Sequence, residues 1–448
     1  MKALNPPRLK GMTSNLELDP GLRTTIPLGR ISKVVGLTLE SLGPQQASIG
    51  DMVEIYKENG GANGPRCPAE VIGFRDNRML LMPLERVEGV ACGDLVERVN
   101  SGLSVPVGPN LIGRVVDALG RPIDGKGAIE TGEWVVSRAE APDSMARQRI
   151  EHRFHTGVRA IDGILPCGYG QRMALIGGSG VGKSTLLGMI SRNAAADVNV
   201  VGLIGERGKE VREFVEDVLG EEGMQRSVVV AVTSDKPALQ RVKGPETAMA
   251  IAEYFRDQGM NVSLILDSLT RYAMGQREIG LAAGEPPTSK GYPPSVCKML
   301  PEFFERAGSN EKGTITGFFT ILVESDDIDD TIADTTRALT DGHIVLSREL
   351  GRKNLYPPID ILSSVSRVDK DVAEEKNLEL GRRFLELYGT YEKYADMIAI
   401  GAYQKGGDEA IDRAIELKPQ LDAFLCQRLE ERAPAEETFA QLEEILST

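Results

Sequence analysis

The residues from 175 to 185 combine glycines, a lysine and a hydroxyl group in the pattern Gly-x-x-x-x-Gly-Lys-Ser, directly after an apolar run typical of a β-strand. The glycines let backbone N–H groups approach a phosphate, and a helix that begins near Lys183 would add the positive end of its dipole. Lys183 would then reach the β- and γ-phosphates of a nucleotide, and Ser184 would hold magnesium. A glycine-rich turn that binds nothing explains neither the Lys-Ser pair nor the strand before it. We therefore predict a nucleotide-binding loop made of Gly177, Gly178, Ser179, Gly180, Val181, Gly182, Lys183, Ser184 and Thr185.

A carboxylate ends a second apolar run. Asp267 directly follows residues 262–266, which have the composition of a buried strand. In a parallel sheet this would put its side chain at the carboxyl edge beside the phosphate loop, where magnesium is held through its water shell. A strand-ending aspartate can also simply cap the next helix. We predict the metal role for Asp267.

A third strand-like run ends in Gly205-Glu-Arg-Gly208. A carboxylate at this place can polarise the water that attacks a γ-phosphate. Glu210 competes for that role, and Glu206 could instead form a surface ion pair with Arg207 or Lys209. We favour Glu206 as the catalytic carboxylate because it lies nearest the strand end.

The pattern of apolar residues changes twice along the chain. Residues 26–99 contain short apolar runs separated by Gly, Pro and Asp-Asn, and successive residues alternate between two faces as they do in β-strands. This pattern favours a small antiparallel barrel. Residues 100–370 alternate apolar strands with helical stretches, which indicates a mostly parallel sheet covered on both faces. In residues 371–448, the i, i+3, i+7 spacing of Phe439, Leu442 and Leu446 predicts a helical domain. Residues 1–25 form an N-terminal extension.

Charge and composition narrow the function further. The 448-residue chain carries a net charge of −14 with a pI near 5.0, which disfavours nucleic acid and anionic membranes and favours basic partners. The five cysteines have no metal-ligand spacing, so we expect small, buried, reduced thiols. The most apolar run, residues 313–323, is too short to span a bilayer. We expect a soluble cytoplasmic protein.

Several longer motifs carry a resemblance to a known family. They are Gly205-Glu-Arg-Gly208, Asp267-Ser-Leu-Thr-Arg-Tyr272, and the segments 284–296 and 341–348. Together they resemble the ATPases of type III protein export, which are related to the catalytic subunit of rotary ATP synthase. The segments 170–173, 177–184 and 186–190 look most like the flagellum-specific member, although the virulence-secretion member shares almost every motif. The resemblance covers nearly the whole chain and implies an α/β fold: a RecA-like P-loop NTPase core with an N-terminal small β-barrel and a C-terminal helical domain.

The same resemblance implies ATP and Mg²⁺ as cofactors and assigns roles to individual residues. Lys183 and Ser184 serve phosphate and magnesium, Asp267 is the acidic metal partner, and Glu206 is the catalytic carboxylate. Two arginines, Arg207 and Arg271, match positions that brace this carboxylate and the γ-phosphate.

Two residues further along match positions with other roles. Tyr356 matches an aromatic residue that packs on the adenine ring, although an ordinary core tyrosine is the alternative. Arg367 matches an arginine finger that enters the neighbouring subunit's site, although a solvated surface arginine would also explain it. A finger supplied across an interface makes a head-to-tail ring, and a chain with both Glu206 and Arg367 permits the homohexamer that the resemblance implies. Catalytic subunits of mixed rings also keep an arginine near this place.

Other partners are implied by the ends and loops of the chain. An acidic segment is expected to face the ring's pore and to attract a basic helical stalk protein, although a solvated acidic turn is equally compatible; its carboxylates are Glu324, Asp326, Asp327, Asp329 and Asp330. The N-terminal extension is expected to hold a regulatory, stator-like partner, but Pro20 and Gly21 interrupt its Leu16, Leu18 and Leu22. The export gate and complexes of export substrates with chaperones complete the expected partners, and contact with the membrane is expected only through them.

We therefore predict Mg-dependent ATP hydrolysis by a ring-forming ATPase that energises type III (flagellar) protein export. A virulence-secretion ATPase is the first alternative. A nucleotide-binding subunit of a mixed rotary ring is the second, and Glu206 counts against its non-catalytic form. An RNA-translocating hexamer resembling the transcription termination factor is disfavoured by the acidic charge and by the lack of a basic, aromatic face.

Overall fold

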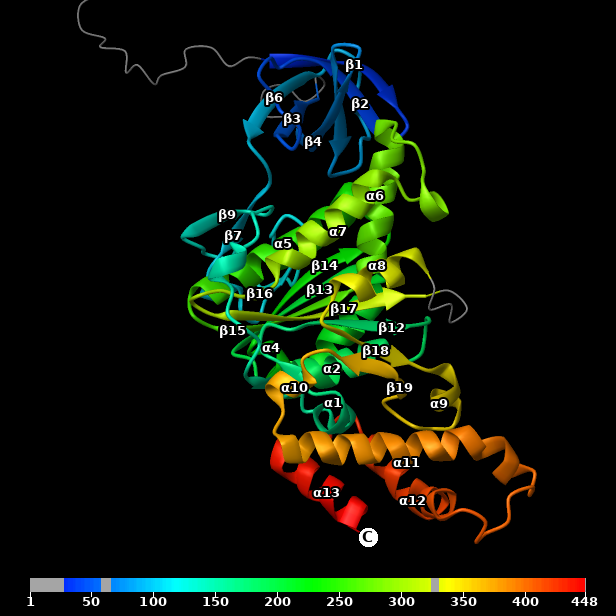
Figure 1. Cartoon of the computed structure of the whole chain (residues 1–448). Coiled ribbons are helices and arrows are strands. Elements are labelled where there is room, and N and C mark those ends of the chain that lie inside the picture. The colour runs from blue at the N-terminus through cyan, green and yellow to red at the C-terminus, as the bar shows by residue number, and fades with distance from the viewer. Residues whose placement is uncertain (1–27, 58–65, 324–329, 448) are drawn as a thin grey trace, which may run out of the picture.

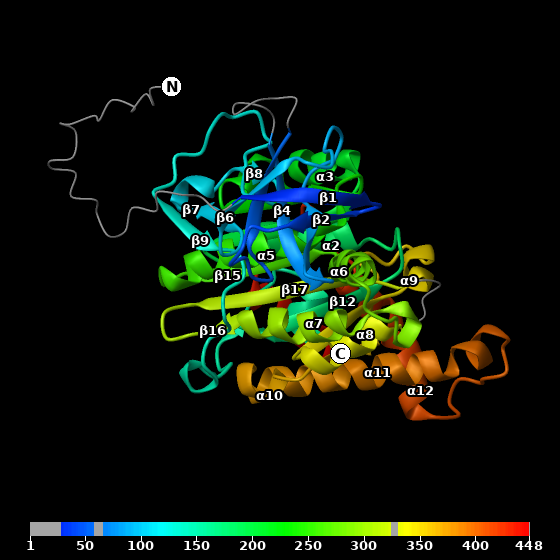
Figure 2. The ribbon, with the colours of Figure 1, turned by 90° about the horizontal axis from the view of Figure 1, so that it is seen from above.

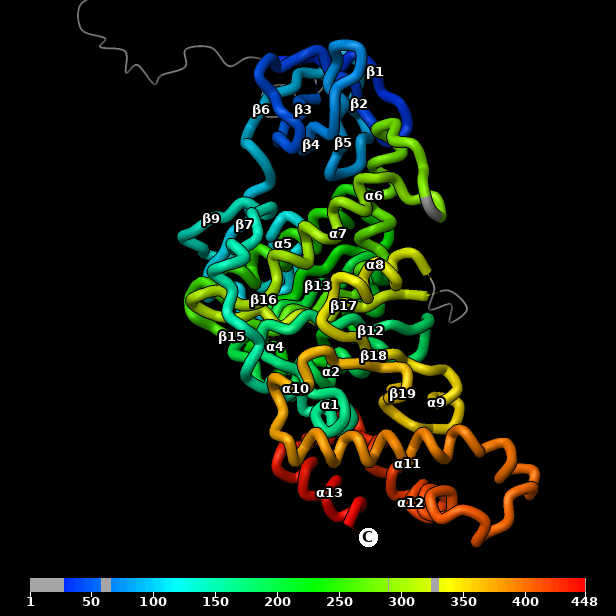
Figure 3. Tube along the Cα trace, viewed as in Figure 1, coloured from blue at the N-terminus to red at the C-terminus, as the bar shows by residue number. Residues whose placement is uncertain are grey.

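The computed structural model describes residues 28–57, 66–323 and 330–447, which form three bodies stacked along one axis (Figure 1). The barrel lies at one end, the sheet domain in the middle and the C-terminal helices at the other end. Figure 3 follows the chain through these bodies in sequence order. The predicted fold class is confirmed: a barrel, a central α/β domain and a helical domain.

The first body is a closed barrel with strand order β1-β2-β5-β4-β3-β6, in which all neighbours are antiparallel. Val53 and Ile55 of β3 point into its core, as the alternation predicts. Met52 lies on the opposite face of this strand, yet it is also buried, because that face packs against the central domain. The six strands are β1 (Leu28–Val35), β2 (Thr38–Leu42), β3 (Met52–Tyr56), β4 (Arg66–Arg75), β5 (Arg78–Pro83) and β6 (Leu95–Asn100).

The central sheet has the order β19-β18-β12-β17-β15-β13-β14-β8 and is parallel except for β19 and the short β16, which pairs with β17. Its strands are β8 (Val115–Val116), β12 (Arg172–Gly177), β13 (Val198–Glu206), β14 (Ser227–Thr233), β15 (Asn261–Asp267), β16 (Gly308–Ser309), β17 (Thr314–Leu322), β18 (Gly342–Leu346) and β19 (Ile359–Ser366). Two small sheets flank it, formed by β7 (Ser104–Val107) with β9 (Glu133–Val136), and by β10 (Arg153–Phe154) with β11 (Cys167–Gly168).

Helices cover both faces of this sheet, as predicted (Figure 1). In β12, Ala174 and Ile176 face the core shared with α5, α6 and α7, whereas Met173 and Leu175 face the core shared with α1 and α2. The helices are α1 (Arg159–Ile164), α2 (Lys183–Asn193), α3 (Gly208–Glu213), α4 (Gly220–Met224), α5 (Ala238–Asp257), α6 (Leu269–Ala283), α7 (Pro294–Arg306), α8 (Thr331–Leu339), α9 (Arg348–Arg352) and α10 (Asp369–Val372). Short helical turns are η2 (Pro109–Leu111), η3 (Ser144–Ala146), η4 (Phe214–Leu219) and η5 (Ser289–Gly291).

The third body consists of α11 (Glu375–Ala399), α12 (Glu409–Leu425) and α13 (Ala435–Ser447). In α13, Leu442 and Leu446 are buried, and the half-buried Phe439 carries the Arg153 guanidinium 4.6 Å from its ring centroid. The helical periodicity read from these residues is therefore confirmed. Seen from the barrel end, α11 and α12 extend beyond the central domain on one side (Figure 2).

A buried ion triad joins the barrel to the central domain. Lys243 of α5 contacts Glu70 of β4 at 2.7 Å and Glu246 at 3.0 Å, and all three side chains are almost fully buried. Burial raises the pKa of Glu70, while the ammonium group opposes this shift. Because a buried carboxylate without a counter-charge is costly, Lys243 fixes the barrel on α5.

The cysteine expectation was only partly right. Cys67 and Cys167 are buried, but Cys92 and Cys297 are exposed and Cys426 is half-buried. All five thiols are free. The residue type alone does not predict the two exposed positions: Cys92 lies in a loop of the barrel, and Cys297 lies on the outer side of α7. Among the described residues, no helix is long and apolar enough to cross a membrane.

Candidate functional site

The predicted phosphate loop connects β12 to α2. The strand ends at Gly177 and the helix begins at Lys183, so the strand-then-helix expectation is confirmed. Gly180 and Gly182 have φ values of 75° and 106°, in the left-handed region that favours glycine. Lys183 is only 7% exposed, and its Nζ donates to the carbonyls of Gly177 at 2.8 Å and Gly178 at 2.6 Å. The ammonium group is therefore folded against the loop.

Four neighbouring parallel strands end beside this loop. In the order β12, β17, β15, β13, their last residues are Gly177, Leu322, Asp267 and Glu206. The carboxyl ends of parallel strands lie at one edge of a sheet, so residues far apart in the sequence meet here. They enclose a cavity of about 370 Å³, lined by Ser179, Gly180, Gly182, Lys183, Ser184, Thr185, Leu203, Glu206, Glu210, Val211, Phe214, Asp267 and Leu322.

Asp267 is the most deeply buried carboxylate of this cavity. Its side chain is 5% exposed, and its Oδ1 accepts a hydrogen bond of 2.7 Å from the hydroxyl group of Thr320. Burial raises the pKa of Asp267, and the charges of Lys183 and Arg271 oppose the shift. The carboxylate is thus held in one orientation at the base of the cavity.

Glu206 and Glu210 both line the cavity, but in different environments. Glu206 is half-buried at the strand end, and burial, Asp267 and Glu210 together raise its pKa to about 8. Glu210 is exposed, accepts a hydrogen bond of 3.1 Å from the backbone N–H of Arg207, and has a lowered pKa because it hydrogen-bonds Glu206. The two neighbouring carboxyl groups therefore differ in acidity, and Glu206 is the weaker acid of the pair. A carboxyl group with a pKa near neutrality can accept and return a proton under working conditions.

The two arginines expected to brace this carboxylate lie in different places. Gly205 has a φ of 73°, and a Cβ there would lie 2.8 Å from Cγ of Arg271, so glycine allows Arg271 of α6 to lie across the end of β13. The charge of Arg271 opposes the rise in the pKa of Glu206 and adds a small part to the lowering of the pKa of Glu210. Arg207 is exposed at the start of α3 and does not line the cavity.

Tyr356 lies in the loop between α9 and β19, with its side chain 48% exposed, so the ring is not part of the hydrophobic core. Its carbonyl accepts a hydrogen bond of 2.8 Å from the backbone N–H of Gln427. The side chain of the buried Gln427 accepts from the N–H of Arg159 at 2.8 Å and donates to the carbonyl of Gly157 at 2.9 Å. The C-terminal domain thus ties the tyrosine loop to the segment that enters α1.

Arg367 directly follows β19 and is exposed, and it does not line its own subunit's cavity. Its Nη2 donates to the carbonyl of Arg337, near the end of α8, at 3.0 Å.

Of the acidic segment, only Asp330 is described: its carboxylate accepts from the N–H of Ile332 at 2.8 Å and caps α8. The other predicted pore residues and the N-terminal extension lie outside the described residues.

Three contributors to the site were not predicted. Thr320 fixes Asp267, Gln427 holds the Tyr356 loop, and Arg348 of α9 donates to the carbonyl of Ser179 at 3.4 Å. Thr320 could have been suspected as a polar residue inside the most apolar run of the chain. Gln427 has no such signal, because its partners lie far away in the sequence.

We expect Tyr356→Ala to weaken ATP binding by about 1 to 2 kcal/mol and Tyr356→Phe to change it little, because only the stacking face of the ring would be used. Stacking discriminates poorly between bases, so GTP should also be hydrolysed. Titration with a fluorescent ATP analogue measures both variants. Unchanged affinity in the alanine variant would remove Tyr356 from the base site.

Two family profiles match the chain in tandem. Residues 157–366 match the nucleotide-binding domain of the ATP synthase alpha/beta family, and residues 373–444 match the C-terminal domain of the type III secretion ATPase EscN. The first match spans the phosphate loop and all the strands that end at the cavity. The second spans most of the C-terminal helices.

Full-length relatives and solved structures agree with these profiles. The "Flagellum-specific ATP synthase" of Bacillus subtilis is 50% identical over 92% of this chain and 94% of its own length. The "Type 3 secretion system ATPase" of Xanthomonas euvesicatoria is 46% identical over 92% and 93%. The assembled ATPase EscN from the enteropathogenic E. coli type III secretion system has a TM-score of 0.88 and 42% identity, covering 93% of this chain and all of that one. With the phosphate loop, the two carboxylates at neighbouring strand ends and these likenesses in place, the chain belongs to the family of type III export ATPases, relatives of the alpha/beta subunits of ATP synthase.

Proposed function

We propose that this ATPase hydrolyses ATP with Mg²⁺ in a homohexameric ring and thereby energises the export of flagellar proteins. The observation that carries the catalytic part is the cavity in which the phosphate loop, Asp267 and Glu206 meet. The flagellar assignment is supported by relatives named as flagellum-specific in Bacillus subtilis, Pseudomonas aeruginosa and Salmonella typhimurium. Relatives named as type 3 secretion ATPases are of similar identity, so virulence secretion is the second candidate.

The donor set of the cavity fits a nucleotide with magnesium. The glycines leave the backbone of the phosphate loop uncovered by side chains, and the Lys183 ammonium group lies against this loop. The buried Asp267 offers a carboxylate whose orientation is fixed by Thr320. Ser184 and Asp267, the latter through water, would hold the metal, which neutralises phosphate charge when bound. Lys183 is assigned to the β- and γ-phosphates.

Glu206 is assigned to orient and polarise the attacking water. Its carboxyl group lines the cavity, and its raised pKa suits proton transfer near neutral pH. Arg271 is assigned to brace this carboxylate, supported by its place across the end of β13. For Arg207 the support is weaker, since its exposed side chain would need to move or to act at a subunit boundary.

Assembly into a homohexamer is supported by Arg367, which is exposed and lies outside the cavity of its own subunit, as expected of a residue that serves a neighbour's site. The chain carries both this arginine and Glu206, so identical subunits suffice to complete every site. The solved relative EscN is described as assembled, and a second structure holds it "in complex with its central stalk EscO". Glu206 counts against a non-catalytic subunit of a mixed ring, since subunits of that kind usually lack the carboxylate.

The proposed partners follow from assembly and charge. A basic helical stalk is proposed for the pore, supported by the five carboxylates in residues 324–330 and by the net charge of −14. A regulatory partner is proposed for residues 1–25, and the export gate and substrate–chaperone complexes for the remaining contacts. The proposed location is the cytoplasm, with the membrane reached through partners.

The test is a chromosomal Glu206→Gln replacement in the source organism, with Glu210→Gln as the matched control. We expect cells with Glu206→Gln to lose flagellar filaments and the secretion of filament subunits, while the protein is present at normal levels. Electron microscopy and analysis of culture supernatants measure both. Normal filaments together with the loss of other secreted proteins would move the function to virulence secretion.

A further inference from the structure

The main chain of Arg367 is hydrogen-bonded to Asp341. The backbone N–H of Arg367 donates to the carbonyl of Asp341 at 2.9 Å. Asp341 lies between the end of α8 and the start of β18, and the carbonyl that accepts from the Arg367 guanidinium, that of Arg337, lies in the last turn of α8. The backbone N–H and the guanidinium group of Arg367 therefore contact carbonyls that lie four residues apart, one after the end of α8 and one in its last turn.

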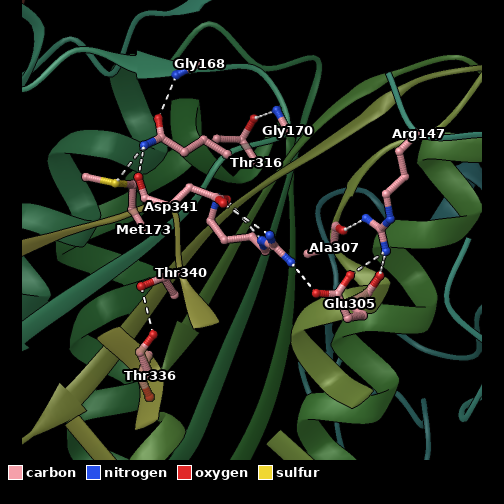
Figure 4. A network of polar contacts seen from close by, with 12 residues as sticks. Arg147, Gly168, Gly170, Met173, Glu305, Ala307, Thr316, Thr336, Thr340 and Asp341 are labelled. Atoms are coloured by element: carbon pink, nitrogen blue, oxygen red, sulfur yellow. Dashed lines mark hydrogen bonds and ion pairs between the residues drawn. The ribbon is translucent and has the colours of Figure 1, made fainter. Parts of the chain in front are cut away.

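The carboxylate of Asp341 is itself held by a fork of hydrogen bonds (Figure 4). Its Oδ2 accepts from the backbone N–H and the Nε of Arg172, each at 3.0 Å, and its Oδ1 accepts from Nη2 at 3.1 Å. The remaining Nη1 of Arg172 donates to Glu305 of α7 at 2.9 Å, and Glu305 also pairs with Arg147 at 3.1 Å. A bidentate arginine–carboxylate pair fixes direction as well as distance. Asp341 thus has little freedom to turn.

A second anchor acts on the residue before Arg367. Gln171 is fully buried, and its Nε2 donates to the carbonyl of Asp341 at 3.0 Å and to Oγ of Ser366 at 3.2 Å. The hydroxyl group of Ser366 in turn donates to the carbonyl of Pro166 at 2.7 Å. Gln171 and Arg172 lie at the start of β12, the strand whose other end carries the phosphate loop. One strand thus anchors both the subunit's own phosphate loop and the arginine proposed to act on its neighbour.

We propose that Asp341 is a positioning residue for Arg367: its carboxylate, clamped by Arg172, holds the carbonyl that aims Arg367 toward the neighbouring subunit. Asp341 does not line its own subunit's cavity and contacts no predicted nucleotide ligand. Its effect should therefore appear in the neighbour's turnover and not in nucleotide binding. This inference rests on the proposed role of Arg367.

The test begins with Asp341→Asn, which keeps the shape of the side chain but turns an amide toward the guanidinium donors. We expect kcat of assembled rings to fall about 10- to 100-fold, since a misplacement of about 1 Å can cost about 100-fold, with KM for ATP unchanged. Arg172→Lys, which keeps the charge but loses the fork, should show the same pattern more weakly. Asp257→Asn is the matched control, because Asp257 also accepts from an arginine Nε, that of Arg256, at 2.9 Å, and should leave kcat unchanged.

Mixed rings separate positioning of the finger from ordinary structural damage. Asp341→Asn subunits keep a working Glu206, so mixing them with Glu206→Gln subunits should recover part of the activity. Mixing them with Arg367→Ala subunits should recover none, because every finger would then be defective. Co-assembly is checked by native mass spectrometry, and Arg172→Lys is used in the same mixtures if Asp341→Asn does not assemble.

The possible failures are distinguishable. Wild-type kcat in Asp341→Asn while Arg367→Ala is inactive would overturn the positioning role alone. Recovery with Arg367→Ala but not with Glu206→Gln would also overturn it, because Asp341 would then serve its own subunit's site. Full activity of Arg367→Ala would instead overturn the proposed function of Arg367, and the positioning role with it.

Discussion

Arg367→Ala is expected to lower the turnover of fully assembled rings by about 10³-fold or more, because an arginine finger stabilises charge that develops only in the transition state. ATP binding should change little, since Arg367 lies outside the cavity of its own subunit. Arg367→Lys should restore little activity, because an ammonium group lacks the planar fork of a guanidinium. Steady-state ATPase assays at protein concentrations where mass measurements show the ring provide the comparison.

A mixing experiment tests whether Arg367 acts across the subunit boundary. Glu206→Gln subunits keep their arginines and Arg367→Ala subunits keep their carboxylates, so mixed rings should contain some complete sites and regain part of the activity. The specific activity of the wild type should also rise steeply with protein concentration. If mixtures that demonstrably co-assemble stay inactive, Arg367 works within its own subunit, and the main argument for an obligate ring is lost.

Glu206→Gln is expected to reduce turnover by about 10²-fold or more while leaving ATP affinity near the wild-type value. The amide keeps the volume of the side chain at the end of β13 but cannot take a proton from water. Glu210→Gln should have a smaller effect, because Glu210 is exposed and already hydrogen-bonded to the backbone N–H of Arg207. Single-turnover assays with excess enzyme separate the chemical step from product release.

Two outcomes would contradict this assignment. Equal losses in the two variants would mean that the carboxylates act as one unit, so that neither is the sole base. Normal turnover in Glu206→Gln would move the catalytic role elsewhere in the cavity. Loss of ATP binding in Glu206→Gln would indicate damage to the phosphate loop and would be visible in the same titration.

The sequence predicted those parts of the site that depend on local pattern. A glycine loop between a strand and a helix, and carboxylates that end apolar strands, are visible in short windows, and the rule that parallel strand ends share one edge brings them together. That is why the sequence alone predicts that Lys183, Asp267 and Glu206 lie at one site. The choice of Glu206 over Glu210 rested on the same rule, and the structure adds the physical difference between them: Glu206 is half-buried next to Asp267.

The parts that could not be predicted depend on contacts between distant residues. Thr320 meets Asp267 because β17 lies between β12 and β15, an order that no local window reveals. The clamp of Arg172 on Asp341 joins residues 169 positions apart. The exposed position of Arg207 was equally hidden, because a residue one place beyond a strand end points either into the site or away from it, depending on how the next helix begins.

The hydrogen bonds of Gln427 also have a consequence for the order in which the protein is made. Lys183 of the phosphate loop leaves the ribosome 244 residues before Gln427 does, a delay on the order of 10 to 50 s at the usual rates of synthesis. During that time the entry to α1 lacks the amide that bridges Gly157 and Arg159, and the loop of Tyr356, once made, lacks the N–H that fixes its carbonyl. A chain that ends before Gln427 therefore contains the phosphate-loop residues but lacks the contacts that join the Tyr356 loop and the entry to α1 to the C-terminal domain.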